Sequence, residues 1–199
     1  EMTLPNRLTV ARLVLSPVFF IVFNLRYWIG EGAYDLSTIL CLVLFCIIEL
    51  TDLFDGKIAR KQHLVTDLGK VMDPFGDTLA HLTYFVCFMI ARIMPSWVFI
   101  IIMYREFSIL FVRMLMISQG KVMPANMFGK TKTVTYAVGG VLGILYLAFS
   151  RWMEGASWLH GYSILLTVVF VLCAFASLFS FVVYAVKIHK DGSLSHMTR

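Results

Sequence analysis

Charged side chains are scarce in this sequence. Only 15% of its 199 residues are Asp, Glu, Lys or Arg, whereas 59% are hydrophobic and the mean hydropathy is +0.82. A soluble domain of this size could not bury so much apolar surface, so the composition excludes a soluble protein. Long polar insertions are also lacking, and we therefore predict a single domain over residues 1–199.

Cysteine is rare as well, and each cysteine lies inside an apolar run. This placement predicts small buried side chains and excludes a disulfide framework or a metal-ligand spacing for Cys41, Cys46, Cys87 and Cys173. No small-residue cleavage site follows the first apolar run, so we expect no cleaved signal peptide. The absence of an internal repeat argues against a transporter built from inverted repeats. Glu1 and the polar end near 192–199 are interpreted as additions to the natural chain.

Six apolar segments are long enough to cross the hydrocarbon core of a bilayer, which takes about 20 helical residues. The sequence therefore predicts an all-α polytopic membrane protein with six transmembrane helices. A short N-terminal interfacial helix is expected near Arg7 and Arg12, with Asn6 as its cap; ordinary snorkelling at a helix start is the alternative. The predicted spans are 8–28, 36–60, 71–93, 96–118, 132–150 and 161–187.

Basic residues near the helix ends predict the orientation. With the N-terminus inside, twelve Lys and Arg residues fall on the cytoplasmic side and three on the other side, while Arg105 and Arg113 lie within the fourth span. We therefore expect both termini on the cytoplasmic side of a membrane, most simply a bacterial inner membrane. The net charge of +5 suits contact with anionic lipid headgroups, and no nucleic-acid partner is expected.

Four aspartates gather at the predicted cytoplasmic ends of the second and third spans. At about 100° per residue, Asp52 and Asp55 share one face of a helix. Asp73 and Asp77 are one turn apart on a face of the next helix. The short polar turn between the two helices makes them antiparallel neighbours. We therefore expect Asp55 to face Asp73 and Asp52 to face Asp77.

Carboxylates this close repel one another unless cations neutralise them. Oxygen ligands in this number suit a pair of Mg²⁺ or Mn²⁺ ions, an arrangement that supports in-line displacement at phosphorus. The alternative is that the aspartates form salt bridges with arginines and only hold the helices together. We disfavour it because the nearby basic residues are few and lie at the membrane rim. Asp67, in the connecting turn, is interpreted as a solvated or capping residue outside the site.

The spacing of these residues matches a known signature. Asp52-x2-Asp55-Gly56-x2-Ala59-Arg60-x8-Gly69-x3-Asp73-x3-Asp77 resembles the signature of the CDP-alcohol phosphatidyltransferases, and the six-span layout resembles that family over essentially the whole chain. The resemblance implies transfer of a substituted phosphoryl group from a CDP-linked donor to an alcohol, with release of CMP. It also implies a homodimer.

The resemblance also implies roles for individual residues. Two divalent metal ions would be bound by Asp52, Asp55, Asp73 and Asp77, and Asp77 would also act as the catalytic base. The CDP group would be bound by Asp52, Gly56, Ala59, Arg60 and Gly69. In this scheme the metals offset charge on the diphosphate and on the leaving group, while a carboxylate takes the proton of the attacking hydroxyl.

A second polar group indicates the acceptor. Arg105 and Arg113 lie near a shared face of the fourth span, and Lys130 and Lys132 open the fifth. Together they predict a phosphate pocket. Arg105-Glu106, followed downstream by Gly-Lys-x-Lys-Thr, resembles the phosphatidylglycerophosphate synthase branch of the family. That branch implies CDP-diacylglycerol as the donor and sn-glycerol 3-phosphate as the acceptor.

Two alternatives stay open for this group. The lysines can be ordinary positive-inside residues, with Arg105 paired to Glu106 or to a lipid phosphate. In addition, Thr78 stands where the branch usually has lysine, so an inositol phosphate, serine or choline-type acceptor is not excluded. The sequence does not indicate a choice between Mg²⁺ and Mn²⁺, an acyl-chain preference or a regulator.

Glu49 and His81 suggest one hypothesis beyond the signature. Glu49 and His81 are expected at similar depth beneath the aspartates, either as a pair that orients Asp77 or as a plain buried hydrogen bond.

A cation-coupled transporter is disfavoured because it would distribute acidic residues across the membrane depth. A non-catalytic lipid-binding scaffold is disfavoured because it has no use for Asp77 beside metal ligands.

Overall fold

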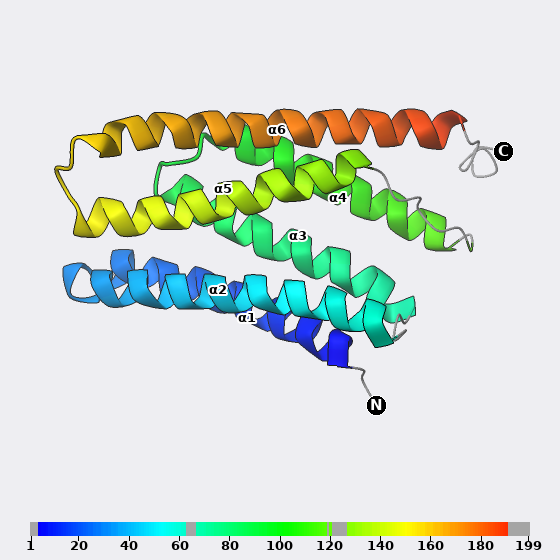
Figure 1. Ribbon diagram of the computed structural model, residues 1–199, viewed down its shortest axis with the longest axis horizontal. Coiled ribbons are helices and arrows are strands. Elements are labelled where there is room, and N and C mark those ends of the chain that lie inside the picture. The colour runs from blue at the N-terminus through cyan, green and yellow to red at the C-terminus, as the bar shows by residue number, and fades with distance from the viewer. Residues whose placement is uncertain (1–3, 63–66, 119, 121–126, 191–199) are drawn as a thin grey trace.

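The computed structural model describes residues 4–62, 67–118, 120 and 127–190, without the side chains at 5, 55–62, 67–71, 127–130 and 190. Within this part of the chain the protein forms six α-helices, in agreement with the number predicted (Figure 1). Polar residues at the ends continue most helices beyond the predicted apolar spans, because helical hydrogen bonding does not stop where the apolar sequence does. The bounds are α1 Leu4–Trp28, α2 Glu31–Gln62, α3 Asp67–Ile90, α4 Ser96–Ser118, α5 Met127–Trp152 and α6 Trp158–Lys190.

Short connections make consecutive helices antiparallel. Helices α1 and α2 are joined through Ile29 and Gly30, and Gly30 has a φ of 95°, which residues with a side chain rarely adopt. The starts of α1, α3 and α5 therefore lie at the same end of the bundle as the ends of α2, α4 and α6, as Figure 1 shows.

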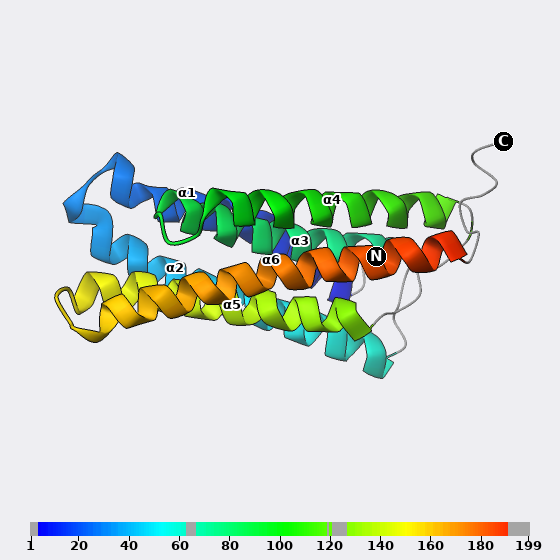
Figure 2. The same ribbon diagram turned by 90° about the horizontal axis from the view of Figure 1, so that it is seen from above.

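Helix α3 lies in the middle of the bundle, where it contacts α1, α4 and α5. Figure 1 shows it between the α1–α2 pair and the group formed by α4, α5 and α6, and Figure 2 shows the same bundle from above. The core around α3 is aromatic. The ring of Tyr84 lies 5.0 Å from that of Phe19 and 4.8 Å from that of Phe45, while Phe85 packs against Phe170 at 6.3 Å. Polar residues of α3 are thus presented to several other helices at once.

Helices α1 and α3 approach each other closely at Gly76. A Cβ atom at this position would lie 3.2 Å from Cγ2 of Thr9 and 3.9 Å from the Thr9 carbonyl oxygen. A larger residue would force Thr9 or its helix to shift by a few tenths of an ångström. Glycine therefore allows the first helix to lie against the face of α3 that carries Asp73 and Asp77.

Among the described residues, four helices, α1, α2, α5 and α6, are long and apolar enough to cross a membrane. The other two, α3 and α4, carry several ionisable residues inside their predicted spans. The six-span prediction is therefore confirmed for the number of described helices and for four of the spans. Helix α1 is continuous, and no separate helix precedes it among the described residues, so the interfacial helix stays a prediction. The ionisable residues are Asp73, Asp77 and His81 in α3 and Arg105, Glu106 and Arg113 in α4.

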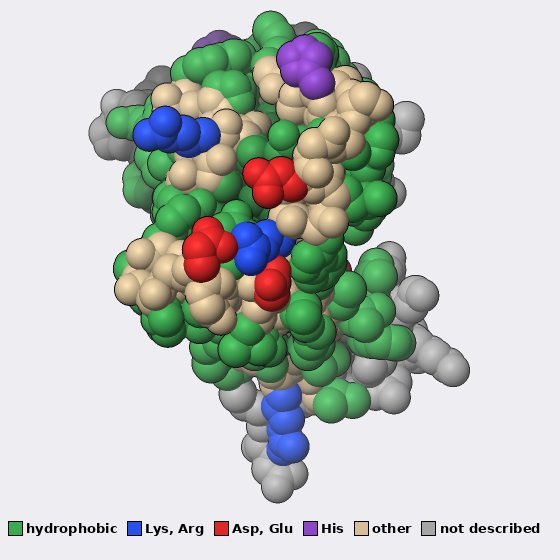
Figure 3. Space-filling view, turned by 90° about the vertical axis from the view of Figure 1, so that its left-hand side faces the viewer, with side chains coloured by type: hydrophobic (Ala, Val, Ile, Leu, Met, Phe, Trp, Pro, Cys, Tyr) green, Lys and Arg blue, Asp and Glu red, His purple; other side chains and the backbone are tan. Residues whose placement is uncertain are grey.

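The end of the bundle opposite the chain termini has an ion-pair cluster of its own. Arg151 of α5 approaches Asp35 Oδ1 through Nε at 2.7 Å and Glu31 Oε2 through Nη1 at 2.9 Å. Figure 3 looks onto this end, where a basic side chain lies between acidic ones among hydrophobic and uncharged neighbours. The cluster ties α5 to the start of α2, at the other end of that helix from Asp52.

Candidate active site

Three of the predicted carboxylates converge from two helices. Asp52 comes from α2, and Asp73 and Asp77 come from one face of α3, as the four-residue spacing predicted. A carboxylate oxygen of each lies within 4.8 Å of one from each of the other two. Such a group carries strong mutual repulsion, which a cation must offset.

In this structure Arg12 of α1 supplies a positive charge to the three carboxylates. Its Nη1 atom lies 2.9 Å from Oδ1 of Asp52 and 3.6 Å from Oδ1 of Asp73, and it also forms an ion pair with Asp77. The Arg12 side chain is only 1% exposed. It reaches the site because it lies one turn after Thr9, where Gly76 lets the two helices approach.

This position corrects the interpretation of Arg12 as a residue at the membrane rim. The argument against arginine salt bridges rested on that placement, and the structure shows such bridges. A signal was present in the sequence, since Arg12 stands inside the first predicted apolar span, where a charged side chain needs a partner. The bridges leave the carboxylates able to bind metal, because Asp52, Asp73 and Asp77 are each about a third or more exposed, at 34%, 45% and 35%.

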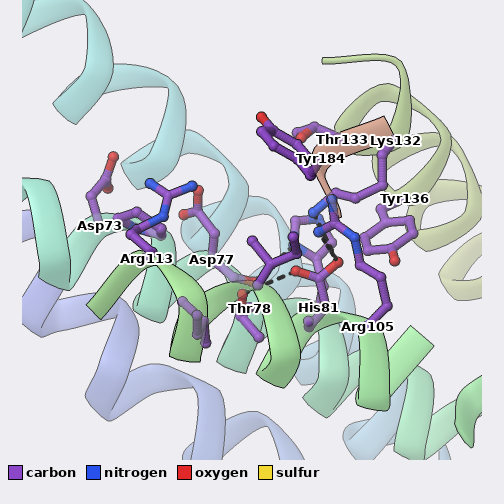
Figure 4. Close-up of a pocket in the computed structure, with 14 residues that line it drawn as sticks. Asp73, Asp77, Thr78, His81, Arg105, Arg113, Lys132, Thr133, Tyr136 and Tyr184 are labelled. Atoms are coloured by element: carbon purple, nitrogen blue, oxygen red, sulfur yellow. Dashed lines mark hydrogen bonds and ion pairs between the residues drawn. The ribbon is translucent and has the colours of Figure 1, made fainter. Parts of the chain in front are cut away.

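Three of the four predicted cations lie beside two of these carboxylates in one pocket of about 320 Å³. Arg105 and Arg113 of α4 and Lys132 of α5 line it together with Asp73 and Asp77. In the view of Figure 4, the two aspartates lie on one side and Arg105 and Lys132 on the other. The structure thus brings the aspartate group and the cation group into a single cavity.

Glu106, also from α4, organises the cations. Its Oε1 atom accepts hydrogen bonds from Arg105 Nη1 at 2.9 Å and from Lys132 Nζ at 3.0 Å. Arg105 also donates from Nη2 to Ser180 of α6 at 2.8 Å. The pairing of Arg105 with Glu106, considered above as an alternative to phosphate binding, is therefore present. Because Glu106 faces both Arg105 and Lys132, this side of the pocket keeps a net positive charge for an anionic ligand.

Thr78 completes this network. Its hydroxyl donates to the second oxygen of Glu106, Oε2, at 3.3 Å, and the side chain is buried. A threonine hydroxyl therefore occupies the position beside Asp77 for which the resemblance suggested lysine. The sequence interpretation considered Glu106 only as a partner of Arg105 and Thr78 only as a departure from lysine. It did not predict their contact, which joins residues 28 positions apart.

His81 lies in the same pocket, one turn beyond Asp77 on α3. Its Nδ1 atom is 2.9 Å from the backbone carbonyl oxygen of Asp77. Among the described contacts none joins His81 to Glu49, so the pairing suggested above stays a prediction.

Several predicted site residues lie outside the described side chains. They belong to helices α2, α3 and α5, and their predicted roles in metal, CDP and phosphate binding stay predictions. These residues are Asp55, Gly56, Ala59, Arg60, Gly69 and Lys130. Asp67 is the first residue of α3, so it lies at a helix start instead of within the turn.

The signature residues belong to a wider sequence match. The pattern of the CDP-alcohol phosphatidyltransferase family matches residues 2–173 of the chain. The chain belongs to this family. The resemblance based on the aspartate spacing is therefore confirmed, and the match extends from α1, which carries Arg12, into α6.

Relatives within the CDP-alcohol phosphatidyltransferase family include named bacterial enzymes. The chain is 35% identical to the CDP-diacylglycerol–glycerol-3-phosphate 3-phosphatidyltransferase of Treponema pallidum, over 90% of this chain and 88% of the relative. It is 36% identical to the enzyme of the same name from Bacillus subtilis, over 65% of this chain and 70% of the relative. With its apolar helices, the chain is an integral membrane protein of the CDP-alcohol phosphatidyltransferase family.

The described residues fit the divalent metal on which CDP-alcohol phosphatidyltransferases depend. Three carboxylates offer oxygen atoms within 4.8 Å of one another, and oxygen is the donor that Mg²⁺ and Mn²⁺ prefer. Oδ1 of Asp73 is buried and accepts no hydrogen bond within the described part of the chain, so it is available as a ligand. Asp52, Asp73 and Asp77 can therefore hold a metal ion.

Proposed function

We propose that this protein transfers the phosphatidyl group from CDP-diacylglycerol to sn-glycerol 3-phosphate, forming phosphatidylglycerophosphate and CMP. One observation carries the proposal: Asp73 and Asp77 line the same pocket as Arg105, Arg113 and Lys132. The carboxylate side suits the reacting phosphorus and hydroxyl, and the cationic side suits an acceptor that itself carries phosphate. The names of the relatives from Treponema pallidum and Bacillus subtilis support this choice of substrates.

Two divalent ions, Mg²⁺ or Mn²⁺, would be held by Asp52, Asp55, Asp73 and Asp77. When bound they would offset negative charge on the diphosphate of the donor and on departing CMP. A pair of ions is preferred to one because four signature carboxylates are present.

In the proposed reaction, Asp77 accepts the proton of the attacking hydroxyl of glycerol 3-phosphate. The hydroxyl oxygen forms a bond to the phosphorus of the phosphatidyl group, and the bond from that phosphorus to the oxygen of CMP breaks. Arg12 holds Asp52 and Asp77 toward each other by its ion pairs. Contacts to CDP are assigned, on the family signature, to Asp52 and to the residues Gly56, Ala59, Arg60 and Gly69.

The cations would bind the phosphate of the acceptor. Arg105 and Lys132 are held in place by Glu106, at 2.9 Å and 3.0 Å. Arg113 has no ion pair with a carboxylate within the described residues, and its Nε atom is buried without a hydrogen-bond partner. A phosphate group can satisfy such donors. Lys130 is assigned to the same pocket on the family resemblance.

The activity is tested by CMP release from purified protein in lipid nanodiscs. CDP-diacylglycerol is supplied with Mg²⁺ or Mn²⁺ and with glycerol 3-phosphate, inositol phosphate, serine or choline as acceptor. We expect release with glycerol 3-phosphate, its loss in EDTA and its return on adding either metal. No release with any acceptor would contradict the transferase, and release with serine or inositol phosphate alone would overturn the acceptor assignment.

Lys132→Met tests the phosphate pocket. Loss of a charge-assisted hydrogen bond to phosphate is expected to raise the KM for glycerol 3-phosphate about 30-fold, with the KM for CDP-diacylglycerol within about twofold. Glu106 keeps its partner Arg105 in this variant, so the pocket remains intact. Lys187→Met in α6, outside the pocket lining, is the matched control and should change neither constant. An equal rise in both KM values for Lys132→Met would contradict a role in acceptor binding.

The membrane topology and assembly complete the proposal. We propose six spans, with the active site and both termini facing the cytoplasm of a bacterial inner membrane. The excess of basic residues at the predicted cytoplasmic helix ends supports this orientation. The family resemblance supports a homodimer and a single domain over the chain. Accessibility of single cysteines to an impermeant thiol reagent in cells would test the orientation, and the mass of the protein in nanodiscs would test the dimer.

A further inference from the structure

The imidazole of His81 has a defined orientation in the pocket. Its Nδ1 atom lies 2.9 Å from the carbonyl oxygen of Asp77, four residues earlier on α3. A carbonyl oxygen can only accept a hydrogen bond, so Nδ1 carries the proton and donates it. In a neutral imidazole the other nitrogen, Nε2, is then an acceptor.

The surroundings favour the neutral form of the ring. The rings of Tyr136, Tyr84 and Phe85 lie 5.8 Å, 6.2 Å and 6.3 Å from that of His81. The ammonium group of Lys132 lies over the Tyr136 ring at 4.6 Å and lines the same pocket. An apolar environment and a neighbouring cation both disfavour a second positive charge.

Nε2 of His81 is buried and has no hydrogen-bond partner within the described part of the chain. A buried acceptor without a donor is costly, and such atoms in a binding pocket are commonly satisfied by a ligand. In the view of Figure 4, Thr78 and His81 lie between the two aspartates on one side and Lys132 and Tyr136 on the other. In this view the ring lies between the aspartates, one of which is assigned to the reacting hydroxyl, and Lys132, which is assigned to the phosphate.

We propose that Nε2 of His81 accepts a hydrogen bond from the middle hydroxyl of glycerol 3-phosphate. The inference rests on the function proposed above and deepens it. The acceptor carries three groups on three carbons: the reacting hydroxyl goes to Asp77, the phosphate goes to the cations, and the middle hydroxyl falls between them. His81 thereby makes the enzyme selective for an acceptor with a hydroxyl group next to the carbon that reacts.

The test compares two acceptors that differ only in this hydroxyl. Propane-1,3-diol monophosphate keeps the reacting hydroxyl and the phosphate but lacks the middle hydroxyl. We expect the wild-type protein to show a KM for this acceptor about tenfold higher than for glycerol 3-phosphate, with kcat less affected. In His81→Leu, which has no acceptor atom, the two KM values should agree within about twofold because the glycerol 3-phosphate value rises. His81→Gln, whose amide oxygen can replace Nε2, should recover part of the preference.

Thr83→Val is the matched control. Thr83 is on the same helix and likewise hydrogen bonds to the carbonyl four residues earlier, with Oγ1 2.7 Å from the oxygen of Leu79. It does not line the pocket. This variant loses a similar helix contact and should keep the wild-type preference for glycerol 3-phosphate.

The outcomes separate this inference from the function on which it rests. If the wild-type protein releases no CMP with glycerol 3-phosphate, both the proposed function and the role of His81 are contradicted. Release with equal KM values for the two acceptors would overturn the role of His81 and leave the function intact. An equal rise of both KM values in His81→Leu would likewise show that His81 only supports the helix. If His81→Leu does not fold, the wild-type ratio and His81→Gln decide the question.

Discussion

Asp77→Asn is expected to lower the rate of CMP release by about 10³-fold, because the amide can neither accept the proton of the hydroxyl nor carry the charge of a metal ligand. The substitution keeps the size of the side chain. It also removes one of three carboxylates that lie within 4.8 Å of one another, so it lessens repulsion in the folded protein. The midpoint of thermal unfolding should therefore not fall. Single-turnover CMP release and a thermal unfolding curve check the two expectations.

Two further measurements define the role of Asp77. Asp35→Asn, at the other end of α2 from Asp52, removes a carboxylate that pairs with Arg151 and should leave CMP release unchanged. A titration with Mn²⁺ separates the two functions of Asp77. If Asp77 acted only as a metal ligand, a high Mn²⁺ concentration would restore CMP release by Asp77→Asn. If Asp77 is also the base, added Mn²⁺ would not restore CMP release. Activity within tenfold of wild type at ordinary metal concentration would contradict both roles.

Arg12→Met is expected to have the largest effect on stability. In the described part of the chain, every ion pair of Asp52, Asp73 and Asp77 is made with Arg12. Removing one partner of a buried ion pair typically lowers the free energy of unfolding by about 3–5 kcal/mol. We expect about 3 kcal/mol here, because the carboxylates are partly exposed to solvent. For a chain of this size, that corresponds to a fall of about 6–12 °C in the unfolding midpoint measured in EDTA.

Added Mg²⁺ should recover part of this loss, because a bound cation also compensates the carboxylates. We further expect CMP release to fall about 100-fold, since the positions of Asp52 and Asp77 depend on Arg12. Arg12→Lys keeps the positive charge but lacks the planar guanidinium group. Its unfolding midpoint and its rate of CMP release should therefore lie between those of the wild type and of Arg12→Met. An unchanged unfolding midpoint in EDTA would show that Arg12 does not stabilise the carboxylate cluster.

Arg151→Met is the matched control for Arg12→Met. Arg151 also bridges two carboxylates of another helix, at 2.9 Å and 2.7 Å, but it lies at the opposite end of the bundle on the surface. Its loss should cause a much smaller change in the unfolding midpoint, because exposed ion pairs contribute little. CMP release should stay at the wild-type rate.

Tertiary contacts decided the parts of the site that sequence spacing did not predict. Arg12 and Asp77 are 65 residues apart, and Arg105 and Ser180 are 75 residues apart, so neither contact follows from helical periodicity. Arg12 was assigned to the membrane rim because a count of basic residues near helix ends does not consider where a helix approaches its neighbour. Gly76 favours that approach, because a Cβ atom at this position would lie only 3.2 Å from Cγ2 of Thr9.

The features that could be predicted are those set within one helix or one short turn. Apolar runs determine which segments become helices, and the four-residue spacing places Asp73 and Asp77 on one face whatever surrounds them. A short connection then places Asp52 opposite them. By contrast, Glu106 links α3, α4 and α5 through Thr78, Arg105 and Lys132, and this depends on how three helices pack. The sequence alone determined the family and the carboxylates, through local geometry. Only the packing of distant helices decided which cations and hydroxyl groups meet them, because those contacts have no fixed spacing along the chain.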